Sequence, residues 1–141
     1  MKPCKDCVAQ GIATNRPAPH PGPRCVSHNR ERKKAISAKS HAAHTKKTYG
    51  ITAEEYWAIY EAQGGKCAMC GRATGKTKRL SVDHDHKCCS GPISCGKCVR
   101  GLLCGICNVY LGRVGDDPNV FVRSAQYVRY PPAQAVINSL N

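Results

Sequence analysis

Residues 67–70 read Cys-Ala-Met-Cys and residues 104–107 read Cys-Gly-Ile-Cys, so each segment carries two cysteines with two residues between them. A two-residue spacer lets one tight turn supply two metal ligands, and tetrahedral zinc takes four. The two pairs therefore predict one shared structural zinc site, formed by Cys67, Cys70, Cys104 and Cys107. We expect the long interval 71–103 to carry structure of its own. A closed site of four thiolates leaves no position for substrate, so this zinc is expected to stabilise the fold and not to catalyse.

The composition favours metal as a substitute for a hydrophobic core. Val, Ile, Leu and Phe make up only about 16% of the 141 residues, a level at which strongly charged chains are usually disordered unless something else holds them. The odd count of 11 cysteines argues against a complete disulfide set. No apolar stretch follows Met1-Lys2-Pro3-Cys4, and no run approaches the roughly 20 apolar residues of a membrane helix. We therefore expect a soluble, cytoplasmic protein in a reducing compartment, with no membrane partner.

A second zinc site is predicted near the N-terminus. Its ligands are three thiolates and one imidazole, an ordinary complement for structural zinc, from Cys4, Cys7, Cys25 and His28. The proline-rich segment between the two halves would form the arm of a zinc finger. The alternative is a flexible arm with free cysteines.

Four cysteines remain, namely Cys88, Cys89, Cys95 and Cys98. They can form a third zinc site, although adjacent cysteines share one metal only with strain. Alternatively, Cys95 and Cys98 complete the site of Cys67 and Cys70. The sequence leaves both pairings open, and we expect two to three zinc ions per chain.

The net charge of +13, from 22 basic and 9 acidic residues, indicates a polyanion-binding protein. Nucleic acid is the default partner, and a merely soluble basic protein is the alternative. Phosphate contacts would give affinity and register without reading sequence. The residues expected to make them are Arg30, Arg32, Lys33, Lys34, Lys76, Lys78, Arg79 and Arg100.

Local patterns predict a small α+β arrangement. Thr52 and Glu55 have capping-box spacing, which favours a helix over 52–63. Asp117-Pro118 favours a helix start there, with its end before Pro131-Pro132, and the last nine residues are expected to be loosely held. Short strands are predicted at 80–86 and 99–103, and a helix from 105 to about 114. The expected segments are a zinc finger-like arm (1–28), a basic linker or helix (29–48), a core (49–117), and a C-terminal helix and tail (118–141).

Asp83-His84-Asp85-His86 lies between the two cysteine pairs, and Asn108 directly follows Cys107. Mg²⁺ prefers oxygen ligands, which the Asp83 carboxylate and the Asn108 side-chain carbonyl can supply. A neutral imidazole beside that ion can take a proton from the attacking water. The ion can then stabilise charge on a phosphate and on its leaving oxygen. This set predicts a metal-assisted phosphodiester hydrolase; the alternatives are further zinc ligands or a solvated turn.

The ordered set of motifs resembles the phage recombination endonuclease VII family, one of the HNH or ββα-metal nucleases. The resemblance covers about residues 49–117 and rests on Cys67-x-x-Cys70, Asp83-His84-Asp85-His86, Arg100-Gly101-Leu102-Leu103-Cys104, Cys107-Asn108 and Leu111-Gly112. It implies that Asp83 and Asn108 hold catalytic Mg²⁺ or Mn²⁺, that His84 is the general base, and that His86 contacts the scissile phosphate or the metal. The implied fold is a zinc-stapled α+β protein whose HNH ββα-metal core is preceded by helices and an N-terminal zinc finger.

The resemblance implies a divalent-metal-dependent DNA endonuclease of a phage, acting in the bacterial host cytoplasm. Leu111 stands where the junction-resolving family member carries an acidic residue, so a DNA nickase or double-strand endonuclease fits better than a branched-DNA resolvase. Partners among phage packaging or replication proteins, and a monomer or a dimer, all remain open. The competing hypotheses are a non-catalytic zinc-finger protein that binds DNA or RNA, and a nuclease that acts on RNA.

Overall fold

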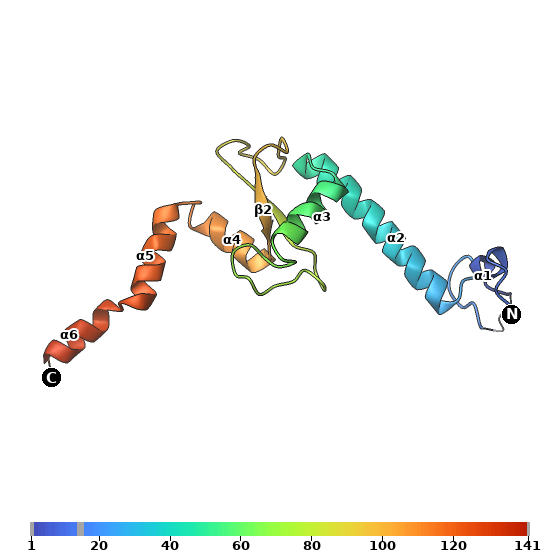
Figure 1. Ribbon diagram of the computed structural model, residues 1–141, viewed down its shortest axis with the longest axis horizontal. Helices are drawn as coiled ribbons and strands as arrows, with labels where there is room; N and C mark the ends of the chain where they lie inside the picture. Colours follow the sequence, from blue (N-terminus) through green and yellow to red (C-terminus); the bar gives the residue numbers. More distant parts are fainter. Residues whose placement is uncertain (1, 14–15, 141) are drawn as a thin grey trace. The chain divides into compact units, whose positions relative to one another are not determined.

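The computed structural model describes residues 2–13 and 16–140. Two strands pair in one sheet, and helices account for most of the remaining regular structure (Figure 1). This confirms the predicted small α+β class. The elements in chain order are α1 (Lys5–Ala9), α2 (Val26–His44), the π-helical turn η1 (Thr45–Tyr49), α3 (Ala53–Ala62), β1 (Ser81–His84), β2 (Val99–Leu103), α4 (Gly105–Arg113), α5 (Pro118–Arg129) and α6 (Pro132–Leu140).

The chain divides into two compact units. The first unit comprises Met1–Ala58 and His84–Val99, and the second comprises Ile59–Asp83 and Arg100–Asn141. Among the described residues, the first unit contains two clusters of possible metal ligands and the second contains one. None of the described helices is long and apolar enough to cross a membrane.

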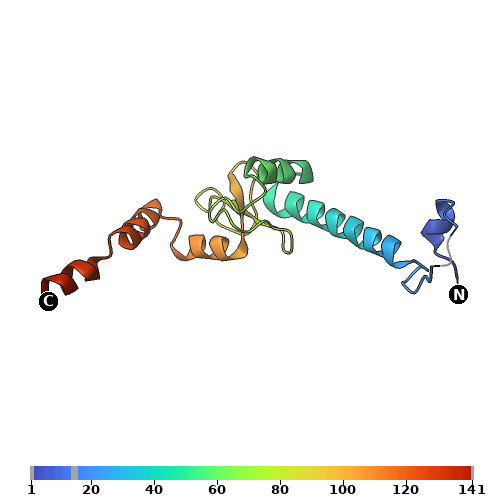
Figure 2. The same ribbon diagram turned by 60° about the horizontal axis from the view of Figure 1, so that its bottom comes forward.

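In the first unit, α2 is a long helix of 19 residues (Figure 2). Residues 30–40 are all exposed, and Asn29 is the one buried residue of the helix. The helix has no apolar stripe to pack against a core. Its alanine, lysine and arginine residues favour it by their intrinsic helix propensity. The Thr45 hydroxyl donates to the carbonyl oxygens of His41 and Ala42, at 3.0 and 3.1 Å, where α2 passes into η1. Gly50, with a φ of 70°, then reverses the chain.

The start of α3 confirms the capping box. The Thr52 backbone N–H donates to the Glu55 carboxylate at 2.6 Å, and the Glu55 N–H donates to the Thr52 hydroxyl at 3.2 Å. Tyr56 follows and is almost fully buried. Its ring lies edge-on to His41 at a centroid separation of 4.5 Å, so this contact packs the first turns of α3 against α2.

In the second unit, Gln63 joins the residues after α3 to β2. Its amide nitrogen donates to the carbonyl of Leu102 at 2.9 Å, and its amide oxygen accepts from the Leu102 N–H at 2.8 Å. A side chain at Gly101 would place its Cβ 2.9 Å from that same amide oxygen, which explains the glycine. The Ala68 N–H donates to the other side of the Leu102 carbonyl at 3.1 Å. One glutamine therefore serves as the hydrogen-bonding partner of an edge strand.

The C-terminal helices match the sequence in part. Asp117 caps α5 by accepting from the Asn119 N–H at 2.9 Å, with Pro118 in the first turn, as predicted. The sequence predicts that the last nine residues are loosely held; the structure has the helix α6 there, none of whose residues is buried, so the expectation stays a prediction. Proline is tolerated in the first turn of a helix, so Pro132 can begin α6 just as it ends the segment before it. The sequence also gave no signal for the five-residue helix α1.

Candidate zinc centres and active-site residues

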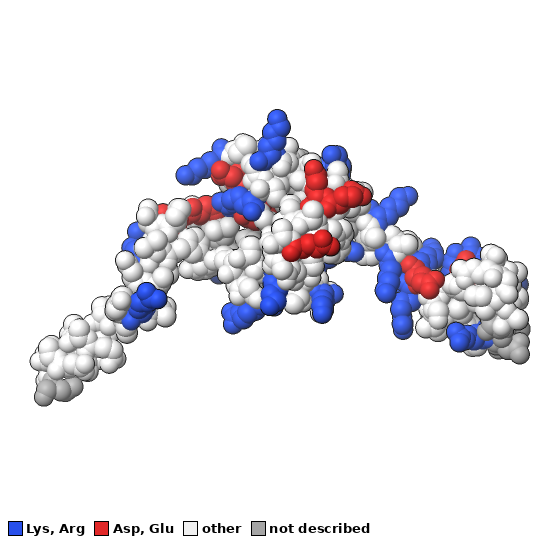
Figure 3. All heavy atoms as spheres, in the orientation of Figure 1, with Lys and Arg blue, Asp and Glu red and all other residues white. Residues whose placement is uncertain are grey.

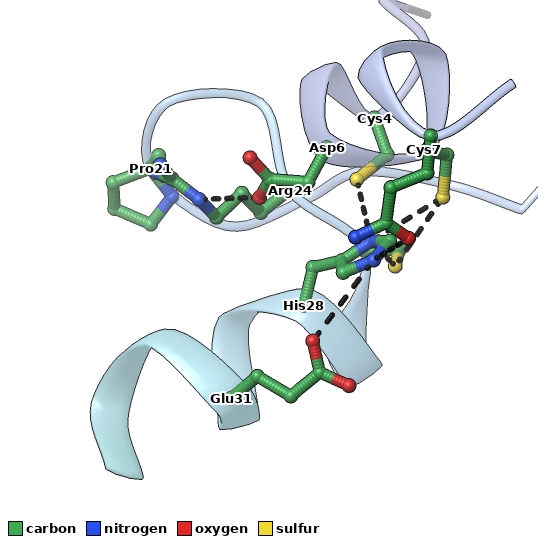
Figure 4. Close-up of polar contacts among 9 residues, drawn as sticks. Cys4, Asp6, Cys7, Pro21, Arg24, His28 and Glu31 are labelled. Carbon is green, nitrogen blue, oxygen red and sulfur yellow. Dashed lines mark hydrogen bonds and ion pairs between the residues drawn. The ribbon is translucent and has the colours of Figure 1, made fainter. Parts of the chain in front are cut away.

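The N-terminal cluster brings together the four ligands predicted for a zinc finger. Cys4 and Cys7 flank the start of α1, while Cys25 and His28 flank the start of α2 (Figure 4). The Nδ1 atom of His28 lies 3.4 Å from the Sγ atom of each cysteine, and the sulfurs of Cys7 and Cys25 are 4.0 Å apart. Tetrahedral zinc places two sulfurs about 3.8 Å apart and a sulfur about 3.6 Å from a nitrogen. The donor set therefore has the dimensions of a zinc site.

Hydrogen bonds outside this cluster orient its ligands. The Nε2 atom of His28 lies 3.1 Å from the side-chain oxygen of Gln10, which can only accept, so Nε2 carries the proton and Nδ1 has the free lone pair. Arg24 donates to the Asp6 carboxylate at 2.7 Å and to the Pro21 carbonyl at 3.1 Å, which closes the loop between the two halves (Figure 4). The three cysteines are buried together and form a small core of their own.

The second cluster, Cys67, Cys70, Cys104 and Cys107, is the one predicted from the two Cys-x-x-Cys pairs. Its ligand atoms all lie within 4.8 Å of one another. A tight turn shapes the first pair, since the Cys67 N–H donates to Ala73 and the Cys67 carbonyl accepts from Gly71. Backbone N–H groups of Ala73 and Arg72 donate to the Cys70 sulfur and lower its pKa to about 6, which favours the thiolate that zinc requires.

The third cluster is formed by Cys88, Cys89, Cys95 and Cys98, and it lies in the connection between the strands. The sulfur separations are 3.9 Å for Cys88 and Cys95, 4.0 Å for Cys88 and Cys89, and 3.8 Å for Cys95 and Cys98. These distances fit tetrahedral zinc despite the two adjacent cysteines. The structure thus groups Cys95 and Cys98 with Cys88 and Cys89, and the alternative pairing with Cys67 and Cys70 is wrong.

The structure places Asp83 of β1 in an ion pair with Arg100 of β2. The guanidinium donates to both carboxylate oxygens, at 2.7 and 3.1 Å, and to the carboxylate of Asp116 at 2.9 Å. These hydrogen bonds, that to Asp83 foremost, raise the pKa of Arg100 further above its ordinary value. A pocket of about 400 Å³ is lined by these three residues together with Met69, Leu111 and Phe121.

Asp116 is a site residue that the sequence analysis missed. It has a φ of 55°, unusual for a residue other than glycine. Its Oδ1 atom is buried and, among the described residues, has no hydrogen-bond partner. The pattern Asp117-Pro118 predicts only a helix start, and nothing in the sequence points to a pairing of the preceding Asp116 with Arg100, 16 residues away.

His84, the last residue of β1, is only 5% exposed. Its Nε2 atom lies 3.2 Å from the carbonyl oxygens of both Cys89 and Gly91. Because carbonyls only accept, Nε2 is the donor, and in the neutral ring the lone pair therefore lies on Nδ1. The ring of exposed His86 lies beside that of His84, with centroids 4.6 Å apart. The strand predicted over 80–86 is shorter in the structure, because β1 ends at His84 and His86 lies in the turn that follows. The ring of Tyr49 also lies near that of His84, with centroids 6.2 Å apart.

The remaining predicted residues occupy two kinds of position. Asn108 lies in the first turn of α4, where its N–H donates to Cys104. Figure 3 shows Lys and Arg side chains projecting along α2. Arg30, Arg32, Lys33, Lys34, Lys76 and Lys78 are exposed, whereas Arg79 is half-buried and Arg100 is held by two carboxylates.

Comparison with known proteins assigns the family. The model of the family described as recombination endonuclease VII matches residues 42–130. The chain belongs to the recombination endonuclease VII family. The gene 59 proteins of Mycobacterium phages D29 and L5 are 57% and 54% identical to it over 137 residues. The match covers 96% of this chain in both cases, and 78% and 79% of the respective relatives.

Membership in the endonuclease VII family confirms the resemblance drawn from the motifs. The matched region includes the Cys67 to Cys107 cluster, the Asp83-His84-Asp85-His86 run and the third cluster, but it begins after the N-terminal cluster. The two phage relatives extend the similarity across nearly the whole chain. The family is one of endonucleases, so its members are phosphodiester hydrolases.

Proposed function

We propose that the chain is a DNA endonuclease of the HNH type that requires Mg²⁺ or Mn²⁺, with His84 as general base. The observation that carries this proposal is the state of the His84 ring. Two carbonyl oxygens accept from Nε2, so the opposite nitrogen is free to take a proton. A neutral imidazole held in one tautomer is suited to remove a proton from an attacking water.

Asp83 and Asn108 would hold the divalent ion. Asp83 directly precedes His84 in β1, and its carboxylate offers about four lone-pair positions, of which Arg100 uses two. The carboxylate can therefore keep its ion pair and still provide an oxygen ligand. When bound, the ion would stabilise negative charge on the phosphate and on the leaving oxygen. Arg100 fixes the orientation of Asp83, and its contact with DNA, expected from sequence, stays a prediction.

The order β1, β2, α4 supports the ββα-metal assignment, because the three elements carry the residues that the resemblance assigns to that motif. Asp83 and His84 end β1, Arg100 lies in β2, and Asn108 lies in the first turn of α4. In this scheme His86, exposed beside His84, contacts the scissile phosphate. The three cysteine clusters would each hold one structural zinc.

DNA would be held by two basic regions. Along α2, eleven consecutive exposed positions, 30–40, carry five basic residues and Glu31 as the one acidic residue. A helix without an apolar face does not bury itself against a protein core. Its positively charged side chains can instead neutralise phosphates of the DNA backbone. The second region precedes β1, where Lys76 and Lys78 are exposed. We propose that the substrate is DNA in the host cytoplasm, cleaved as a nick or a double-strand break.

Cleavage of supercoiled plasmid tests this function. We expect the zinc-loaded protein to convert the plasmid to open-circular or linear DNA in Mg²⁺ or Mn²⁺, and not in a buffer from which both of these ions are left out. His84→Ala should abolish conversion, whereas His20→Ala, a matched control in the N-terminal loop, should not. A folded, zinc-loaded protein that binds but never cleaves plasmid, branched DNA or RNA would instead be a non-catalytic binding protein. Preferential cleavage of RNA would redirect the substrate assignment.

A further inference from the structure

The third cysteine cluster and the candidate general base share the same loop. Cys89 contributes its sulfur to the cluster, 4.0 Å from that of Cys88, and its carbonyl oxygen to His84. The second carbonyl on His84 belongs to Gly91, which lies between Cys89 and Cys95 in the chain. Both acceptors of the His84 ring therefore lie within the stretch that the four cysteines would tie to one metal ion.

Hydrogen bonds, and almost no apolar packing, hold this loop in place. Residues 85–98 form no helix or strand, and Ser94 is the one buried residue among them. The Ser94 N–H donates to Thr48 at 2.8 Å, and the Asp85 N–H donates to Cys98 at 2.9 Å. The loop backbone at Gly96 packs closely on Gly50, the residue after η1. A Cβ on Gly96 would lie 2.9 Å from the Gly50 carbonyl oxygen. The N–H groups of Cys88 and Cys89 also donate to the Asp85 carbonyl, at 3.1 and 3.0 Å, which forms a turn at the start of the loop. These hydrogen bonds fix both ends of the loop, but no apolar residue of 85–98 is buried, and none holds the stretch around Gly91.

A metal ion would supply the missing constraint. The sulfurs of the cluster already stand 3.8 to 4.0 Å apart, the spacing of a tetrahedral thiolate site. The Ser94 hydroxyl lies 3.3 Å from the Cys98 sulfur, the kind of outer contact that orients a metal ligand. Binding at this site would restrict the backbone from Cys88 to Cys98, and with it the two carbonyl groups.

We propose that zinc bound by Cys88, Cys89, Cys95 and Cys98 positions His84 by fixing the Cys89 and Gly91 carbonyls that accept from its Nε2. The proposal rests on the proposed function only in giving His84 the role of base. The cysteines are positioning residues that act through His84. Without this zinc the loop moves, the ring loses its fixed tautomer and orientation, and turnover falls while the fold and DNA affinity persist.

Cys95→Ser is the sharpest test, because Cys95 is exposed and makes no contact with His84 that the structure records. Ile93→Ala, at a 63% exposed residue of the same loop, is the matched control. We expect Cys95→Ser to bind one zinc fewer per chain and to retain its far-UV circular dichroism. Its kcat should fall about 10- to 100-fold, the usual range for losing an outer contact of a functional site, with little change in KM. Ile93→Ala should match the wild type in every respect.

The ring itself gives a readout that needs no cleavage. Nitrogen-15 NMR of His84 should show a single tautomer protonated at Nε2 in the wild type and in Ile93→Ala. In Cys95→Ser it should show exchange between tautomers. Loss of one zinc with an unchanged His84 spectrum would overturn the positioning proposal, as would a wild-type protein that binds only two zinc ions. If the wild type shows the single tautomer but cleaves nothing, the proposed function fails while the positioning proposal stands.

Discussion

The cluster of the second unit and the cluster in the loop 85–98 each consist of four cysteines, but their surroundings are opposite. Cys67 and Cys107 are buried, and buried Leu80, Leu102 and Leu103 lie in the same unit. In the loop cluster, by contrast, Cys88 and Cys95 are exposed and no apolar residue of 85–98 is buried. A buried cluster can replace a hydrophobic core, whereas an exposed one can only restrain the backbone around it. The same chemistry would thus stabilise one unit and position a side chain in the other.

Removing a ligand from the buried cluster should have the largest effect. Structural zinc contributes on the order of 10 kcal/mol of apparent binding free energy, comparable to the whole stability of a small domain. We expect Cys104→Ser to unfold the second unit, seen as lost amide protection for residues of β2 in hydrogen exchange. Ser124→Ala in α5 of the same unit serves as the control. If Cys104→Ser kept wild-type protection and thermal stability, this cluster would not be the core of its unit.

Stepwise zinc removal should separate the two clusters. Chelators reach exposed thiolates first, so titration should release about one zinc per chain from the loop cluster before the structural sites yield theirs. Cleavage should fall with this first zinc, while far-UV circular dichroism changes only with the later ones. Release of all the zinc in one cooperative step, together with unfolding, would show that the clusters do not differ as proposed.

Acidification should distinguish the same two sites. A hydrogen bond with the Cys98 sulfur, as the largest cause, raises the pKa of Cys88 to about 12, and burial raises that of Cys107 to about 12. Zinc must therefore displace thiol protons at neutral pH in both clusters, and the zinc affinity of both should fall as the pH falls. Because Cys88 and Cys95 are exposed whereas Cys67 and Cys107 are buried, the loop cluster should release its zinc at the higher pH. Competition titrations with a zinc-binding dye at several pH values measure both, and the reverse order would contradict the comparison.

The smallest effect is expected on α2. Each phosphate contact contributes about 0.9 to the slope of log affinity against log salt concentration. A double variant, Lys33→Ala with Lys34→Ala, should lower that slope by up to about 2 for double-stranded DNA and leave the catalytic rate at saturating DNA unchanged. Lys66→Ala, at an exposed lysine outside the proposed contacts, is the control. Equal slopes for the double variant and the wild type would remove α2 from the DNA interface.

Local and metal-ligand patterns could be predicted from the sequence because their physics is local. The Thr52–Glu55 capping box, the strand at 99–103 and the Cys-x-x-Cys spacing each depend on residues close in the chain. The ion pair of Arg100 with Asp116 could not be predicted, since it needs a left-handed backbone at Asp116 and joins β2 to the turn between α4 and α5. The hydrogen bonds of His84 were missed for a related reason. They end on backbone carbonyls, which leave no signature in the side chains.

The most direct test of the account is the single-turnover rate of plasmid cleavage in Mg²⁺ for the wild type, His84→Ala and His20→Ala, at equal zinc content per chain. A positioned general base contributes about 10²- to 10⁴-fold to a rate. The account predicts a loss of that size for His84→Ala, with unchanged circular dichroism and DNA affinity, and a wild-type rate for His20→Ala. Cleavage by His84→Ala at the wild-type rate would contradict the account, because the base would then lie elsewhere.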